Sequence, residues 1–163
     1  MSNKIFYPLI VILLIIPFVL IAMYWNAIPE TVPIHYNIRM EPDRWAPKAT
    51  GLFMLPCISL FVVGLLLVVP SIDPKGNLEK YIGIYRSIVL AVTLLVTGLF
   101  ALQIFRYVGY DVPLDYIPLS VVVLMTFVGN LMLKVKPNYF LGIRTPWTLE
   151  NDEVWRRTHR VGG

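Results

Sequence analysis

Four long stretches of this chain carry no charged residue, and polar, proline-rich or basic segments separate them. These charge-free stretches are residues 5–29, 49–72, 87–105 and 116–133. A helix that crosses about 30 Å of hydrocarbon needs roughly 20 residues. Arg86, Arg106 and Lys134 can lengthen the two shorter stretches by extending their charges to the lipid headgroups. The pattern therefore predicts membrane spans at about 5–24, 50–70, 79–106 and 117–135.

The composition agrees with lipid as the surrounding solvent. Of the 163 residues, 57% are hydrophobic and 15% are charged, whereas soluble domains are about 25% charged. No long polar segment leaves room for a separate soluble domain. We expect an all-α membrane protein, a four-span transmembrane helical bundle forming a single integral membrane domain, 1–163. A Pro-rich outer loop, 25–49, and a C-terminal segment, 136–163, with a short interfacial helix complete it.

The distribution of Lys and Arg predicts the orientation. Ten of the 14 basic residues, Lys75 among them, fall on the side of the N-terminus if all four stretches cross the membrane. The positive-inside rule then places both termini in the cytoplasm. Because the basic residues flank the spans and form no single patch, direct nucleic-acid binding is not predicted.

The outer loop contains the first group of candidate site residues, which combine ring, amide and carboxylate side chains. They are Pro33, His35, Asn37, Pro42, Asp43 and Trp45. Residues 31–38 alternate enough for a short extended segment, and Pro42 and Asp43 have turn chemistry. His35, Glu41 and Asp43 could form hydrogen bonds with one another, contact a partner or ligand, or contribute to a metal site. Their spacing matches no standard ligand set, so no metal is predicted.

The C-terminal segment holds the second group. Arg144 can pair with lipid phosphate or with helix-end carbonyls, and Trp147 marks an interface. Asn151 and the acids after it predict a helix start, with Glu153 placed four residues before Arg157. Val154, Trp155 and Thr158 would share one face of that helix. Such a short basic helix either anchors at the anionic inner leaflet or docks a cytoplasmic partner.

Catalysis and ion transport find no support in the motifs. The chain has no HExxH motif, no glycine-rich phosphate loop and no nucleophile–base pair on a span. The four charge-free stretches contain no carboxylate, which argues against an ion-coupled pump. We therefore predict a non-enzymatic protein without a cofactor.

Two motifs resemble a known family. Pro137-Asn138, Gly142-Ile143-Arg144-Thr145-Pro146-Trp147-Thr148-Leu149, Val154-Trp155 and Thr158-His159-Arg160 look like the signature of the SdpI family of bacterial immunity proteins. The outer-loop motif looks like the small domain of unknown function that often precedes that signature. The eight-residue block starting at Gly142 makes this resemblance specific.

The resemblance implies a multi-pass protein of the bacterial cytoplasmic membrane. It would protect the cell against a secreted peptide toxin and relay the toxin's presence to a cytoplasmic transcriptional repressor. The implied inner partner-binding residues are Asn138, Gly142, Ile143, Arg144, Thr145, Pro146, Trp147, Thr148, Val154, Trp155, His159 and Arg160. The outer loop would face the toxin. The residues alone also allow two other functions. The protein could be a structural or assembly subunit that binds other membrane proteins through faces at Gly64, Gly98 and Gly129, or it could be a small transporter.

The chain departs from the family pattern at two places. Family members usually have a glycine before the Pro-Asp turn, where this chain has Met40, so we expect the turn to lack a positive-φ residue. Family members also usually continue into two more spans. Here the sequence ends at Gly163, as expected for either a shortened homologue or a fragment.

Overall fold

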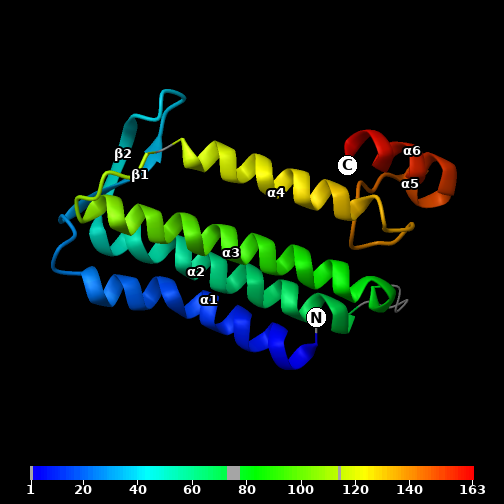
Figure 1. Cartoon of the computed structure of the whole chain (residues 1–163), viewed down its shortest axis with the longest axis horizontal. Helices are drawn as coiled ribbons and strands as arrows, with labels where there is room; N and C mark the ends of the chain where they lie inside the picture. The colour runs from blue at the N-terminus through cyan, green and yellow to red at the C-terminus, as the bar shows by residue number, and fades with distance from the viewer. Residues whose placement is uncertain (1, 73–77, 114) are drawn as a thin grey trace.

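The computed structural model describes residues 2–72, 78–113 and 115–163; Lys75, used in the orientation argument, lies outside them. Its long helices run side by side (Figure 1), with a β-hairpin at one end of the molecule and two short helices at the other. The N-terminus lies at the end that carries the short helices. The long helices are α1 (Asn3–Tyr24), α2 (Lys48–Val68), α3 (Ile82–Tyr107) and α4 (Tyr116–Met132); α5 (Pro146–Glu150) and α6 (Asp152–Gly162) are short.

Three helical segments are long and apolar enough to cross a membrane. They are Asn3–Tyr24, Lys48–Ile72 and Glu79–Tyr107, the second and third including short 3-10 turns. Helices long and apolar enough to span a membrane therefore occur where spans are predicted, at 5–24, 50–70 and 79–106. In place of the predicted span at 117–135 the structure has the apolar helix α4, which has only 17 residues. The four-span count and the single-domain organisation stay predictions.

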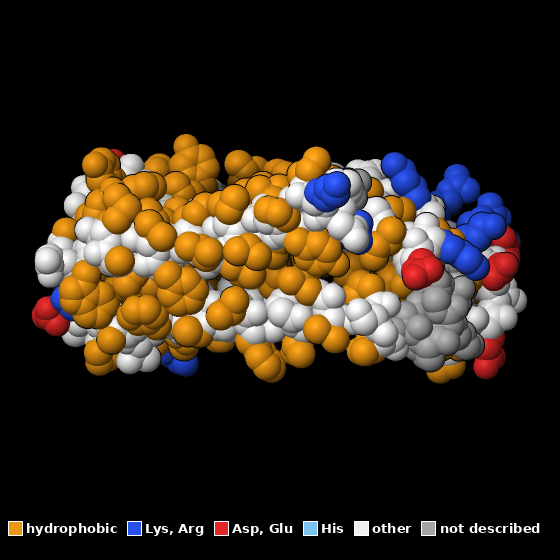
Figure 2. Space-filling model, turned by 90° about the horizontal axis from the view of Figure 1, so that it is seen from below, with side chains coloured by type: hydrophobic (Ala, Val, Ile, Leu, Met, Phe, Trp, Pro, Cys, Tyr) orange, Lys and Arg blue, Asp and Glu red, His pale blue; other side chains and the backbone are white. Residues whose placement is uncertain are grey.

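Two clusters of buried side chains hold α1, α2 and α3 together. Phe6 and Ile10 of α1 meet Tyr85 and Val89 of α3 in one cluster. The second cluster joins Ile21, Leu52, Phe100 and Ile104. Outside these clusters the helices carry large apolar side chains on their surfaces, and Figure 2 shows them as a broad apolar band with charges gathered toward the ends. A surface of this kind is stable in lipid and would aggregate in water.

The predicted outer loop is an ordered β-hairpin, so the expectation of an all-α protein is wrong in this segment. Strands β1 (Thr31–Tyr36) and β2 (Pro42–Pro47) pair antiparallel. Proline is tolerated here because each strand of a two-stranded sheet has a free edge. Val32 is fully buried, and a Cβ on Gly51 of α2 would lie 2.4 Å from Val32 Cγ2. The absence of a side chain at Gly51 thus lets the hairpin pack closely on the start of α2.

The turn of the hairpin contains a positive-φ residue, contrary to the sequence expectation. Met40 itself has a φ of 61° and is the one non-glycine residue with positive φ in the described part of the chain. The amide of Asn37 fixes this turn, since its Oδ1 accepts hydrogen bonds from the backbone N–H groups of Arg39 and Glu41 at 2.8 and 3.0 Å. These bonds hold Met40 in a conformation that normally costs a non-glycine residue about 1–2 kcal/mol.

Candidate functional site

The C-terminal signature begins with a turn organised by one buried amide. Asn138 is 2% exposed. Its Oδ1 accepts from the backbone N–H groups of Phe140 and Leu141 at 2.9 and 2.7 Å, and its Nδ2 donates to the carbonyls of Lys136 and Leu141. An Asn side chain that takes over backbone hydrogen bonds in this way stabilises an irregular segment. Asn138 therefore shapes the loop and offers no free group to a partner.

Gly142 and His159 join this loop to α6. The backbone N–H of Ile143 donates to His159 Nε2 at 2.9 Å, and His159 Nδ1 lies 2.9 Å from the carbonyl of Trp155. Because Nε2 accepts, the proton of the neutral ring belongs on Nδ1, which donates to Trp155. We call this pair of contacts the His159 bridge. Gly142 has a φ of 109°, and a Cβ there would lie 2.3 Å from His159 Nε2, so only glycine fits.

Trp155 lies in the core, on the less exposed side of α6 that it shares with Val154 and Thr158 as predicted. It is 3% exposed, stacks on the His159 ring at a centroid distance of 4.1 Å, and donates from Nε1 to the carbonyl of Val135 at 2.7 Å. Val154 and Thr158 are only half-buried. The indole thus ties α6 to the residues that follow α4.

A threonine pair starts α5. Thr145 is the residue before the helix; its Oγ1 accepts from the backbone N–H of Thr148, and Thr148 Oγ1 accepts in return from the backbone N–H of Thr145 at 2.8 Å. Pro146 occupies the first turn, where a missing N–H costs nothing. Thr148 is fully buried and also donates to the carbonyl of Ile143. This capping arrangement fixes the direction in which the loop leaves the core.

The remaining signature residues point outward. Trp147 is 63% exposed and Ile143 is 37% exposed, while Arg144 and Pro146 also lie on the surface. The Arg144 guanidinium donates to the carbonyl of Tyr139, which lies in a loop and not at a helix end. Pairing of Arg144 with lipid phosphate stays a prediction. We name Ile143, Arg144, Pro146 and Trp147 the exposed tip, and Asn138, Gly142, Thr148, Trp155 and His159 the signature scaffold.

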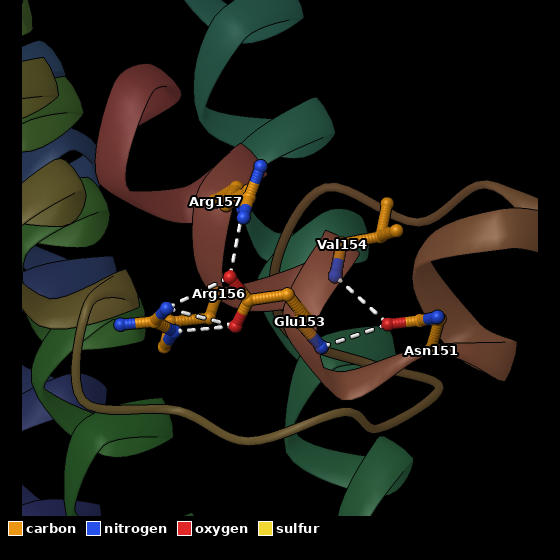
Figure 3. A network of polar contacts seen from close by, with 5 residues as sticks. All are labelled: Asn151, Glu153, Val154, Arg156 and Arg157. Atoms are coloured by element: carbon orange, nitrogen blue, oxygen red, sulfur yellow. Dashed lines mark hydrogen bonds and ion pairs between the residues drawn. The ribbon is translucent and has the colours of Figure 1, made fainter.

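The predicted start and ion pair of α6 are confirmed (Figure 3). Asn151 Oδ1 accepts from the backbone N–H groups of Glu153 and Val154 at 2.9 and 3.1 Å. Glu153 pairs with Arg157 at 2.7 Å and also with Arg156 at 2.8 Å. Hydrogen bonds from Arg156 and then Arg157 lower the pKa of the Glu153 carboxyl to about 2. Two of the basic charges of α6 are therefore partly neutralised, although Arg156 and Arg157, like Arg160, are exposed to solvent.

In the hairpin the candidate polar residues satisfy one another. His35 Nδ1 lies 2.6 Å from Asp43 Oδ1, and Asn37 Nδ2 donates to Glu41 Oε2 at 3.0 Å. Among the described residues, no group of three or more His, Cys, Asp or Glu side chains lies close enough together to hold a metal ion.

Of the other hairpin candidates, Pro33 contacts α3, whereas Pro42 and Trp45 are exposed. The carbonyl of Pro33 accepts from the hydroxyl of Tyr107 at 2.7 Å, which joins β1 to the end of α3. Pro42 is exposed, and Trp45 is 59% exposed. Trp45 is therefore one of the large side chains that the hairpin exposes.

The two groups of candidate residues lie at opposite ends of the molecule, so they cannot form one site. Sequence reasoning missed that Trp155 and His159 pack inside the molecule. The spacing of these two residues was a signal, because residues four apart share a helix face. A face that carries both Trp and His can be buried only if another segment of the chain packs on it. The partner, Gly142, comes from a loop whose path the pattern of residues did not predict.

In comparison with known proteins, the two groups of candidate residues fall in two different family matches. Residues 12–60 match a domain of unknown function, DUF1648, and residues 134–163 match the SdpI/YfhL protein family. The predicted family resemblance is confirmed. The chain is also 27% identical over 153 residues to the "Immunity protein SdpI" of Bacillus subtilis (strain 168), which covers 92% of this chain and 70% of that protein. No solved structure matches the chain.

Proposed function

We propose that this chain is an immunity protein of the bacterial cytoplasmic membrane that protects the cell against a secreted peptide toxin. The observation that carries the proposal is the similarity to an immunity protein over 92% of the chain, combined with three helices long enough to span a membrane. An immunity role needs no catalytic group, which agrees with the absence of catalytic motifs in the sequence. Both termini face the cytoplasm in this proposal, as the positive-inside rule predicts.

The exposed tip is proposed as the docking surface for a cytoplasmic transcriptional repressor. Aromatic residues and Arg are the side chains most enriched at the energetic centres of protein interfaces, and the tip presents Trp147 beside Arg144. Behind the tip, the signature scaffold satisfies its own polar groups, so the tip is held in a defined shape before any partner binds. Such preorganisation lowers the entropic cost of association.

The hairpin is proposed as the surface that meets the toxin. Its most exposed large apolar side chains are Ile38 at 100% and Trp45 at 59% exposure. Its contacts with α2 and α3, through Gly51 and Tyr107, connect it to the bundle. A toxin could influence the exposed tip only if it binds two arrangements of the bundle with different affinity.

The test is survival of a sensitive bacterium that expresses the full chain and is challenged with the toxin peptide of an immunity operon, with repressor recruitment measured on isolated membranes. Trp45→Ala should lower protection, because it removes the proposed toxin contact. Trp147→Ala should abolish repressor recruitment. Val161→Ala, which truncates a 90% exposed apolar residue on α6, is the matched control and should leave both readouts unchanged.

Equal membrane abundance of all variants is required for the comparison. If the wild-type chain gives no protection against any such toxin, the immunity proposal is wrong. If protection is present but Trp147→Ala recruits the repressor as well as Val161→Ala does, the docking role of the exposed tip is wrong while immunity stands.

A further inference from the structure

An apolar groove runs between α3 and α4. It has a volume of about 610 Å³, within the range of roughly 300–1,000 Å³ typical of ligand pockets. Gly98 and Leu102 line its α3 side, and Leu119, Val123 and Phe127 line its α4 side. Gly129 is the one buried residue of α4, so the helix leaves most of its surface to whatever surrounds it.

The groove has the length of one leaflet of a bilayer. On α4 its lining runs from Tyr116 to Phe127, and on α3 from Ala91 to Leu102. At 1.5 Å per residue each stretch is about 16 Å long, and half of a hydrocarbon layer of about 30 Å is about 15 Å. A transmembrane helix of another protein would need a surface along the whole thickness, whereas one acyl chain needs this length alone.

The end of the groove near the hairpin carries a positive charge. A second hollow of about 240 Å³ shares Leu102 and Tyr116 with the groove and adds Tyr36 and Arg106 to the lining. The Arg106 guanidinium lies 5.9 Å from the centroid of the Tyr36 ring. Tyrosines at this level are typical of the headgroup region of a membrane.

Arg106 forms no ion pair with any residue in the described ranges, 2–72, 78–113 and 115–163. Asp111 and Asp115 follow it in the connection to α4, yet neither pairs with it. A half-buried guanidinium without a carboxylate favours an external anion, and its planar fork of N–H donors matches a phosphate group. The groove thus combines an apolar channel one leaflet long with a phosphate-binding group at its mouth.

We propose that this groove binds one acyl chain of an anionic phospholipid whose phosphate lies beside Arg106. The lipid fills the space between α3 and α4 and becomes part of the wall of the bundle. The site lies in the leaflet on the hairpin side, whichever side of the membrane that is, and it is independent of immunity function.

The experiment uses the full chain in phosphatidylcholine vesicles that contain a small fraction of phosphatidylglycerol with a photoreactive diazirine in its acyl chain. After irradiation, labelled residues are mapped by mass spectrometry. Three exposed apolar side chains of α1, at Ile5, Val11 and Met23, which we call the α1 face, report the labelling expected from ordinary lipid contact. We expect labelling per residue in the groove to exceed that of the α1 face at least fivefold.

Two glycines provide a matched pair of variants. A Cβ at Gly98 or at Gly64 meets no atom within 4 Å, so both positions have open space where a larger side chain would start. Gly98→Leu projects into the groove and should reduce groove labelling at least fivefold. Gly64→Leu adds the same side chain to α2, outside the groove, and should leave labelling unchanged.

The charge is tested separately, by repeating the labelling with photoreactive phosphatidylcholine. Arg106→Gln should abolish the preference for the anionic lipid, while Arg39→Gln, which removes a cation from the hairpin turn, should preserve it. Groove labelling equal to that of the α1 face, or unchanged in Gly98→Leu, would overturn the proposal. So would cross-links between two copies of the chain that map to the groove, because a protein would then be its occupant.

Discussion

The His159 bridge should control how often the exposed tip leaves its folded position. His159→Phe keeps an aromatic ring against Trp155, whose ring now stacks on His159 at 4.1 Å, but removes the acceptor for the Ile143 N–H. A buried donor left without a partner costs about 1–3 kcal/mol. Since Ile143 is only partly buried, with 37% of its surface exposed, we take the lower part of this range, about 1–2 kcal/mol.

This loss should appear directly as a change in local opening. Trypsin cleaves after Arg144 when the surrounding segment unfolds, and the cleavage rate then follows the population of the open form. A loss of 1–2 kcal/mol raises that population roughly 5- to 30-fold. The assay is limited proteolysis of the purified chain in detergent, with the Arg144–Thr145 bond followed by mass spectrometry.

Two comparisons make the result interpretable. Cleavage after Arg39 in the distant hairpin is an internal control and should not change. His159→Gln keeps an acceptor oxygen on a side chain of similar reach, so it should restore part of the protection. If His159→Phe is cleaved after Arg144 no faster than the wild-type chain, the His159 bridge does not hold the exposed tip, and our account of the signature scaffold is wrong.

Two further predictions concern single residues. Met40→Gly should stabilise the chain by about 0.5–1 kcal/mol, because relief of the positive φ (about 1–2 kcal/mol) exceeds the entropic cost of glycine (about 0.5–1 kcal/mol). Thermal unfolding in detergent measures this change in stability, with Ile38→Gly as the control. A lowered unfolding midpoint in Met40→Gly would contradict the prediction. The Glu153 carboxyl, whose pKa falls from 4.5 to about 2, should stabilise α6 fully above pH 4.5 and lose that contribution as the pH falls toward 2. Circular dichroism of the wild-type chain and of Glu153→Gln checks this, and a wild-type helix signal with the same pH profile as the variant would refute it.

Much of the membrane architecture could be predicted from the sequence, because hydrocarbon imposes a length and an apolar composition on each span. The stretches at 5–24, 50–70 and 79–106 satisfy both and appear as helices. The start of α6 was equally local: Asn151 caps the helix and Glu153 meets Arg157 one turn later. Interactions between residues only a few positions apart in a helix depend on helix geometry alone. Their pattern can therefore be predicted from the sequence without knowledge of the tertiary structure.

Contacts between distant segments were decided only by the tertiary structure. Met40 has positive φ because the Asn37 side chain and strand pairing impose it, against the intrinsic preference of the residue. The signature residues form one motif in the sequence, yet packing divides them into a buried scaffold around His159 and an exposed tip around Trp147. That division depends on Gly142 meeting α6 across 17 residues of chain, a closure that no local pattern specifies.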